Sequence, residues 1–154
     1  MIVVSNASPL IAGLDIGLGA IFEALFGEIF IPPAVRQEVF TSRPQPSWIT
    51  EHPLTNPSAS RLLQGRLGVG ECEAIALTLE VKADLLLMDE SAGRRTATSL
   101  GVHVMETLGV LLRAKAQQLI PAVSPLLDQL LATGFYVDDE LAKQVRRTAG
   151  ETVE

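Results

Sequence analysis

The sequence predicts an α/β fold with a mostly parallel central sheet and helices on both faces. Three observations support this: hydrophobic residues make up 47% of the chain, short apolar runs recur along it, and helical apolar spacing follows most runs. The run at residues 85–88 has four consecutive apolar side chains, which is typical of a strand covered on both faces. Strands that alternate with helices favour a parallel sheet, because each crossover returns the chain over one face.

The predicted strands are short, and turn or helix-start residues follow most of them. They comprise residues 2–5, 28–31, 48–50, 85–88 and 102–105, with 48–50 expected at a sheet edge and 102–105 expected to be buried. The predicted helices begin where proline, a small polar residue or an acid suits the first turn. They comprise residues 9–14, 18–26, 33–40, 56–64, 71–81, 91–100, 107–118, 124–132 and 139–148. Ser8 is expected to cap the first helix.

The length of 154 residues predicts one domain, residues 1-150, followed by a short C-terminal tail, residues 151-154. The single cysteine, Cys72, excludes a disulfide framework and a cysteine-based zinc site. The first residues lack the basic region of a signal peptide, and no apolar run approaches ~20 residues. We therefore expect a cytoplasmic protein without a membrane partner.

The net charge of −6 argues against a broad basic face that holds nucleic acid. An aromatic content of 5% argues against an extended base-stacking platform for single strands. Both observations leave room for a small cation-loaded site that touches RNA locally.

Two acidic residues bound the most informative stretch of the chain. Glu71 opens a predicted helix, and Asp89 follows the buried strand at residues 85–88. In a parallel sheet, ligands bind at the carboxyl ends of the strands, and Asn6 occupies the same kind of place after the first strand. Each residue also has an ordinary structural interpretation, since an acid stabilises a helix start and an Asp or Asn caps one. Glu38 has the ordinary interpretation of a solvent-exposed helix residue.

Two carboxylates at such ends can converge on one point. Mg²⁺ prefers oxygen ligands of this kind and keeps several waters. A cation held there lowers the pKa of a bound water and neutralises charge on a phosphodiester under attack, without a catalytic histidine. The chain has only two histidines, His52 and His103, neither of which lies in a recognisable motif.

Three segments in order resemble a known family: VVSNASPLI (3–11), IPPAVRQEV (31–39) and LGVGECEAIALTLEVKADLLLMDE (67–90). They are similar to the PIN domain, the fold of VapC-like toxin ribonucleases. GVHVMETLGVLLRAKAQQLI (101–120) and PLLDQLLATGFYV (125–137) resemble a poorly characterised prokaryotic PIN branch. The resemblance spans nearly the whole chain.

The resemblance implies an acidic pocket that binds Mg²⁺ or Mn²⁺ and cleaves RNA by metal-assisted hydrolysis. The implied catalytic acids are Glu38, Glu71 and Asp89, and the implied metal ligands are Asn6, Glu71 and Asp89. The implied auxiliary residues are Ser8, a hydroxyl beside the first position, and Glu90. Where the family has its first acid, this chain has Asn6, which offers a carbonyl oxygen without negative charge.

The implied partners are an RNA substrate, a small antitoxin protein and a second copy of the chain in a homodimer. Arg94 and Arg95 follow Asp89 closely and are the candidate RNA-binding residues, with a solvated helix face as the alternative interpretation. A response-regulator receiver is excluded, because it needs adjacent acids after the first strand and a lysine after a late one. A catalytically weak or inactive PIN-like domain that acts through protein association remains open, and Asn6 favours it.

Overall fold

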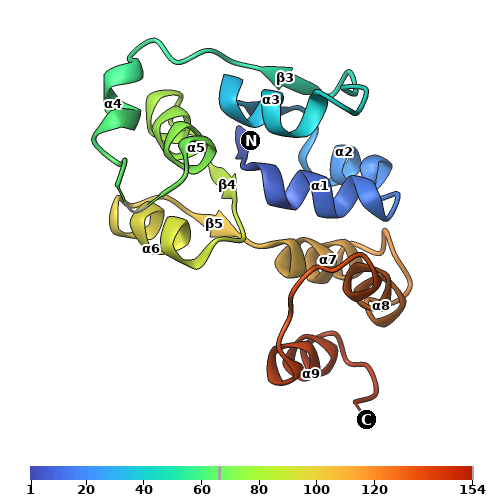
Figure 1. Ribbon diagram of the computed structural model, residues 1–154. Helices are drawn as coiled ribbons and strands as arrows, with labels where there is room; N and C mark the ends of the chain where they lie inside the picture. Colours follow the sequence, from blue (N-terminus) through green and yellow to red (C-terminus); the bar gives the residue numbers. More distant parts are fainter. Residues whose placement is uncertain (66, 154) are drawn as a thin grey trace.

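The computed structural model describes residues 1–65 and 67–153 of the chain. Strands and helices alternate along it, as the sequence predicts (Figure 1). In chain order the elements are β1 (Val3–Ser5), α1 (Ala7–Asp15), α2 (Gly19–Phe26), β2 (Ile29–Ile31), α3 (Pro33–Phe40), β3 (Ile49–Glu51), α4 (Pro57–Arg61), α5 (Val69–Glu80), β4 (Leu85–Leu87), α6 (Ser91–Ser99), β5 (Val104–Met105), α7 (Thr107–Ala116), α8 (Ser124–Ala132) and α9 (Asp139–Thr148).

The central sheet has five strands in the order β3-β2-β1-β4-β5, and every pairing is parallel. This confirms the predicted fold class. From β1 the chain passes to β2 and β3 on one side, and then to β4 and β5 on the other. The strand order therefore reverses between β1 and β4, where Ser5 pairs with Leu87. In open α/β sheets such a switch point is the usual place for a ligand.

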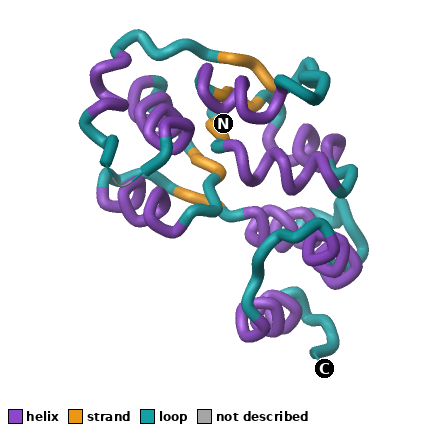
Figure 2. The backbone as a smooth tube through the Cα atoms, in the orientation of Figure 1, coloured by secondary structure: helices purple, strands orange, loops and turns teal. Residues whose placement is uncertain are grey.

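Alternating side chains of the strands divide the core into two parts, because successive residues point to opposite faces. Val3 and Leu87 pack with residues of α1, α2, α3, α7 and α8. Val4 and Leu86 pack with residues of α5 and α6 on the other face. Figure 2 shows the short strands between these two groups of helices. The protein is a three-layer α/β/α structure.

The ends of several elements differ from the prediction. Asn6, not Ser8, is the N-cap residue of α1, because the Ser8 hydroxyl bonds to Asp89 instead of to its own helix. Strand β5 is only partly buried, since it lies at the sheet edge with β4 as its one neighbour. The helix predicted at 56–64 ends at Arg61.

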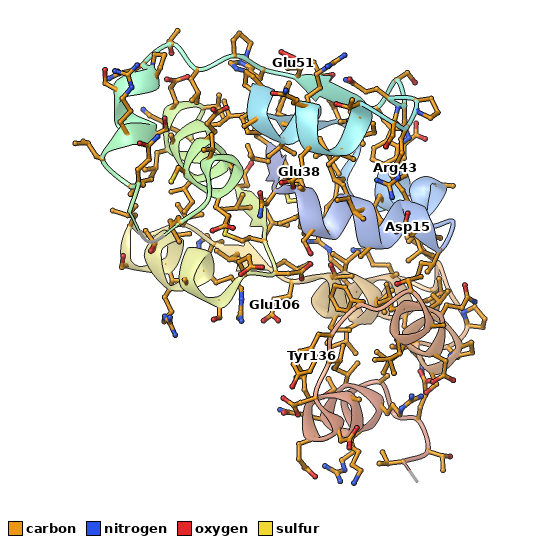
Figure 3. All side chains as sticks on the ribbon, viewed as in Figure 1. Asp15, Glu38, Arg43, Glu51, Glu106 and Tyr136 are labelled. Atoms are coloured by element: carbon orange, nitrogen blue, oxygen red, sulfur yellow. The ribbon has the colours of Figure 1, made fainter. Side chains whose placement is uncertain are left out.

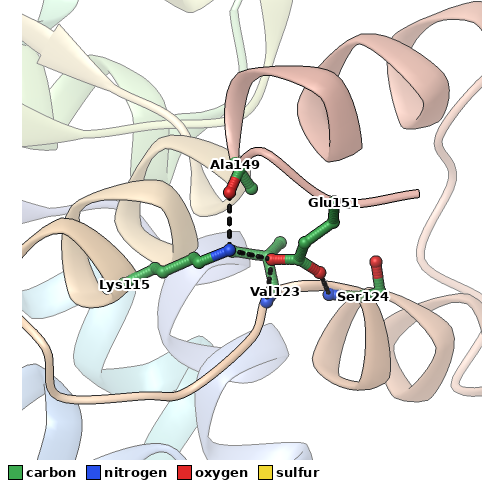
Figure 4. Close-up of polar contacts among 5 residues, drawn as sticks. All are labelled: Lys115, Val123, Ser124, Ala149 and Glu151. Carbon is green, nitrogen blue, oxygen red and sulfur yellow. Dashed lines mark hydrogen bonds and ion pairs between the residues drawn. The ribbon is translucent and has the colours of Figure 1, made fainter. Parts of the chain in front are cut away.

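Hydrogen bonds of Glu151 connect the end of the chain to α7 and to the start of α8 (Figure 4). Glu151 accepts hydrogen bonds from the backbone N–H groups of Val123 and Ser124, both at 2.8 Å. Lys115 Nζ donates to Glu151 Oε2 at 2.8 Å and to the Ala149 carbonyl at 2.5 Å. Glu151, predicted to lie in the tail, therefore belongs to the packed domain. In the part of the chain that the structure describes, no helix is long and apolar enough to cross a membrane.

Replacing Gly13 by alanine should lower the free energy of unfolding by about 1–3 kcal/mol, the usual effect of overpacking a filled core. A Cβ atom at this position in α1 would lie 2.6 Å from Cζ of Phe22, which is buried in α2. The better helix propensity of alanine, about 1 kcal/mol, offsets only part of this. Urea unfolding measures the effect. The matched control is Gly19→Ala, where the nearest atoms lie 3.6 Å away, and an equal loss there would contradict the explanation.

Candidate functional site

Asn6 lies at the carboxyl end of β1, at the switch point of the sheet. Its backbone N–H donates to the Leu87 carbonyl at 2.9 Å, which ties it to the end of β4. The residue is only 5% exposed, yet its amide does not cap α1 and forms no hydrogen bond to another described residue. Gly70 in α5 faces it, since a Cβ atom there would lie 3.6 Å from Asn6 Oδ1. The Asn6 amide oxygen therefore lies between β1 and the start of α5, and it keeps access to solvent, because no buried side-chain oxygen of the described residues lacks a hydrogen-bond partner.

Glu71 lies in the first turn of α5 beside this amide. Burial raises its pKa, the Gly68 N–H that donates to it at 3.3 Å lowers the pKa, and the charges of Glu90 and Glu38 raise it further. The net direction is upward, because burial and like charges both disfavour the ionised form. The acids Glu90, from the segment after β4, and Glu38, from α3, thus both lie close enough to affect Glu71 of α5.

Asp89 follows β4 and holds the starts of two helices together. Its Oδ2 accepts from the hydroxyl groups of Ser8 at 2.9 Å and Thr107 at 2.7 Å, and its Oδ1 accepts from the Thr107 N–H at 2.8 Å. A carboxylate has about four acceptor positions, so these three donors occupy most of them. Asp89 anchors α1 and α7 to the end of the sheet and has little capacity left for a cation.

Arg94 and Arg95 have different environments although they are adjacent. Arg94 is half-buried, and its guanidinium donates to the Asp89 carbonyl at 3.2 Å and to Glu106 Oε1 at 2.8 Å. Arg95 is exposed. The ion pair orients Arg94 within the fold, so Arg95 is the better candidate for a phosphate contact.

Glu38 and Glu73 connect α3 with the site. Glu38 is exposed on α3 (Figure 3). It lines a cleft together with Ser8. Glu73 lies two positions after Glu71 in α5, and its Oε1 accepts from the Ala34 N–H at 3.1 Å. The reason is that α3 packs against α5, which places the start of α3 opposite Glu73. This bond helps to hold α3, and with it Glu38, near Glu71.

The order of these elements agrees with one family model, that of the PIN domain, which matches residues 2–151. The chain belongs to the PIN domain family. The PIN domain is a nuclease-type fold and generally uses divalent metal ions. Comparisons with curated proteins and with solved structures found no match. The resemblance to the PIN domain is thereby confirmed, while the VapC-like branch stays a prediction.

The oxygen atoms at the edge of this PIN domain fit a hard divalent cation in their chemistry, because carboxylate and amide oxygens are what Mg²⁺ binds. Burial, and after it the negative charges of Glu90 and Glu38, raise the pKa of Glu71, and a bound cation would oppose this rise by favouring the ionised carboxylate. Among the described residues, no three acidic, histidine or cysteine side chains are grouped to hold a metal ion. Glu71 and Asn6 are therefore the candidate ligands, and water would have to complete the coordination shell.

Sequence reasoning missed two residues of the PIN site. Glu106 follows β5 as Asp89 follows β4, so the rule that selected Asp89 applies to it as well. Thr107 donates twice to Asp89, and no sequence signal pointed to it, because the two residues are 18 positions apart.

Proposed function

We propose that this PIN domain is a divalent-cation-dependent ribonuclease of the VapC-like toxin type, with cation affinity weakened by Asn6. The observation that carries the proposal is the placement of Asn6 at the carboxyl end of β1, where the strand order reverses, opposite the first turn of α5 that carries Glu71. An amide and a carboxylate oxygen at a sheet switch point suit a hard divalent cation.

In the proposed mechanism, Glu71 and Asn6 hold Mg²⁺ or Mn²⁺. When bound, the cation supplies an activated water and neutralises phosphodiester charge. Glu38 and Glu90, whose charges both act on Glu71, are the acids that would accept the proton of the attacking water. Asp89 positions the Ser8 hydroxyl and the start of α7 rather than acting on the phosphate. Glu90 thus serves as the auxiliary acid and Ser8 as the auxiliary hydroxyl.

RNA is the proposed substrate, and with a net charge of −6 its phosphates must meet a few local basic residues. Arg95 is exposed on α6, the helix that follows Asp89, and is the first candidate. A homodimer and a small antitoxin partner belong to the same proposal, since they rest on the VapC-like resemblance. A cytoplasmic location, expected from the sequence, is proposed with them.

A second function is a PIN domain with little or no catalysis that acts through protein association. Two observations favour it: Asn6 brings no negative charge, and three donors already occupy Asp89. Both reduce the attraction for a cation. Direct measurement of cation binding separates the two functions.

Replacing Glu71 by glutamine should abolish RNA cleavage and weaken Mn²⁺ binding at least tenfold, because it removes the central carboxylate. Titration calorimetry and cleavage of a single-stranded RNA measure the two effects. Glutamine keeps the capping bond to Gly68. Because the pKa of Glu71 is raised on folding, its ionised carboxylate lowers the stability of the folded protein at pH values above the folded pKa. This penalty vanishes below about pH 4.5, where the carboxyl group is protonated in both states. Without cation, Glu71→Gln should therefore be more stable than wild type at pH 7, and the difference should shrink at pH 4.

The matched control is Glu73→Gln, two positions along the same helix, where the acid bonds to the start of α3. It should leave cation affinity unchanged and retain cleavage. If the wild type binds neither Mg²⁺ nor Mn²⁺ at millimolar concentration, the nuclease proposal is wrong and the association function is preferred.

A further inference from the structure

A cleft of about 280 Å³ opens beside the site, between α1, α3 and the segment that follows α8. One wall is a face of α1, and the opposite wall is formed by Thr133, Gly134 and Phe135. Gly134 has a φ of +94°, which turns the chain after α8 and brings Phe135 to the wall. Phe135 is partly buried against the core, so its ring is held in place.

The wall formed by α1 is polar at both ends and apolar in the middle. Ser8, Ile11, Ala12 and Asp15 are spaced i, i+3, i+4 and i+7, so they form one stripe of about 10 Å along the helix. Ser8, at the near end, donates to Asp89 at 2.9 Å. Ile11 and Ala12 give the middle an apolar floor. The stripe thus runs from the proposed catalytic site to Asp15, over a distance comparable to one nucleoside.

At the far end of the cleft, Asp15 forms an ion pair with Arg43, which is not itself a lining residue. Arg43 Nη2 donates to Asp15 Oδ1 at 2.6 Å, and Figure 3 shows the two side chains facing each other at the end of α1. Asp15 Oδ2 has no hydrogen-bond partner among the described residues. A carboxylate fixed in this way offers acceptors beside a guanidinium donor.

We propose that this cleft is a nucleobase subsite that takes guanine next to the phosphodiester to be cleaved. The inference rests on the proposed function, because it assigns one nucleotide of the RNA substrate. Guanine is the one RNA base whose pairing edge sets two N–H donors side by side, and these match the two acceptor oxygens of the Asp15 carboxylate that lines the cleft. The base lies between the floor and the Phe135 ring. One ring suffices for one base, so the low aromatic content excludes only a longer stacking platform.

The test measures binding of free nucleosides without metal, so its result does not depend on catalysis. Heteronuclear NMR titrations in chelator should show guanosine binding at least fivefold more tightly than uridine, adenosine or cytidine, with shifts at Ile11, Asp15 and Phe135. Asp15→Asn should bring guanosine to within twofold of uridine. Thr133→Phe, at the exposed rim, should fill the cleft and weaken guanosine binding at least fivefold. Ala132→Phe is exposed on the same helix end outside the cleft and should change nothing.

The outcomes separate the subsite from the nuclease. Equal binding of all four nucleosides, or guanosine binding that Asp15→Asn and Thr133→Phe leave intact, overturns the subsite. Guanosine binding in the cleft by a protein that cleaves no RNA supports the subsite and contradicts the nuclease. Cleavage without preference for a guanine next to the cut, unaltered by Thr133→Phe, supports the nuclease and overturns the subsite.

Discussion

Replacing Asn6 by aspartate should raise Mg²⁺ or Mn²⁺ affinity at least tenfold and increase RNA cleavage with it. Two unit charges 4 Å apart attract by about 4 kcal/mol at an effective dielectric constant of 20, whereas an amide contributes only a dipole. Desolvation of the new carboxylate offsets part of this attraction. A net gain of about 1.4 kcal/mol in binding free energy already corresponds to a tenfold higher cation affinity. The new carboxyl group would be almost buried beside Glu71, so the cation-free protein should lose stability and regain it on cation binding. Calorimetric titration and thermal unfolding with and without Mn²⁺ measure both effects.

Gln129→Glu is the matched control, because it makes the same amide-to-acid change at an exposed position of α8. It should leave cation affinity and cleavage unchanged. Asp89→Asn should abolish the remaining activity through a different route, since it disturbs the bonds that hold Ser8 and Thr107. If Asn6→Asp leaves affinity and cleavage as they were, position 6 is not part of a cation site and the association function is preferred.

The fold was predictable because its strands carry a strong local signal. Consecutive apolar side chains at 85–88 point to both faces of the sheet, so all of them are buried only if helices cover both faces. In the structure, Leu85–Leu87 are covered on both sides. The parallel arrangement follows from the alternation of strands and helices. Asn6 and Asp89 then fall at neighbouring strand ends, because β1 and β4 pair in register.

The bonding of the acids was not predictable, because it depends on which distant segments come together. Ser8 lies 81 residues from Asp89, and only the sheet order brings the two together. Glu80 is a similar case: it lies seven positions after Glu73 on the same helix, and it accepts from the N–H groups of Thr55 and Asn56 at 3.0 and 2.9 Å. Helical spacing shows which acids share a face, but not which N–H groups another segment directs at it.

Replacing Glu151 by glutamine should lower the free energy of unfolding at pH 7 by about 2 kcal/mol. Burial of this carboxyl group opposes ionisation, but bonds from Lys115, Val123 and Ser124 outweigh it and lower the pKa from 4.5 to about 2. That difference corresponds to at most about 3.4 kcal/mol, and solvent near the ion pair reduces it. Glutamine keeps one acceptor oxygen, loses the charge, and turns an N–H donor toward a backbone N–H.

The pH dependence distinguishes this network from simple packing. A lowered pKa gives stability that is fully present above about 4.5, the unfolded value, and is lost as the pH falls through about 2. The difference between wild type and Glu151→Gln should therefore be constant from pH 7 to pH 5 and should narrow between pH 4.5 and pH 2. Urea unfolding at each pH measures it. Asp128→Asn, which removes an exposed partner of Arg146, should lose less than about 1 kcal/mol. If the difference in free energy of unfolding between wild type and Glu151→Gln stays constant down to pH 2, the carboxylate charge does not anchor the end of the chain.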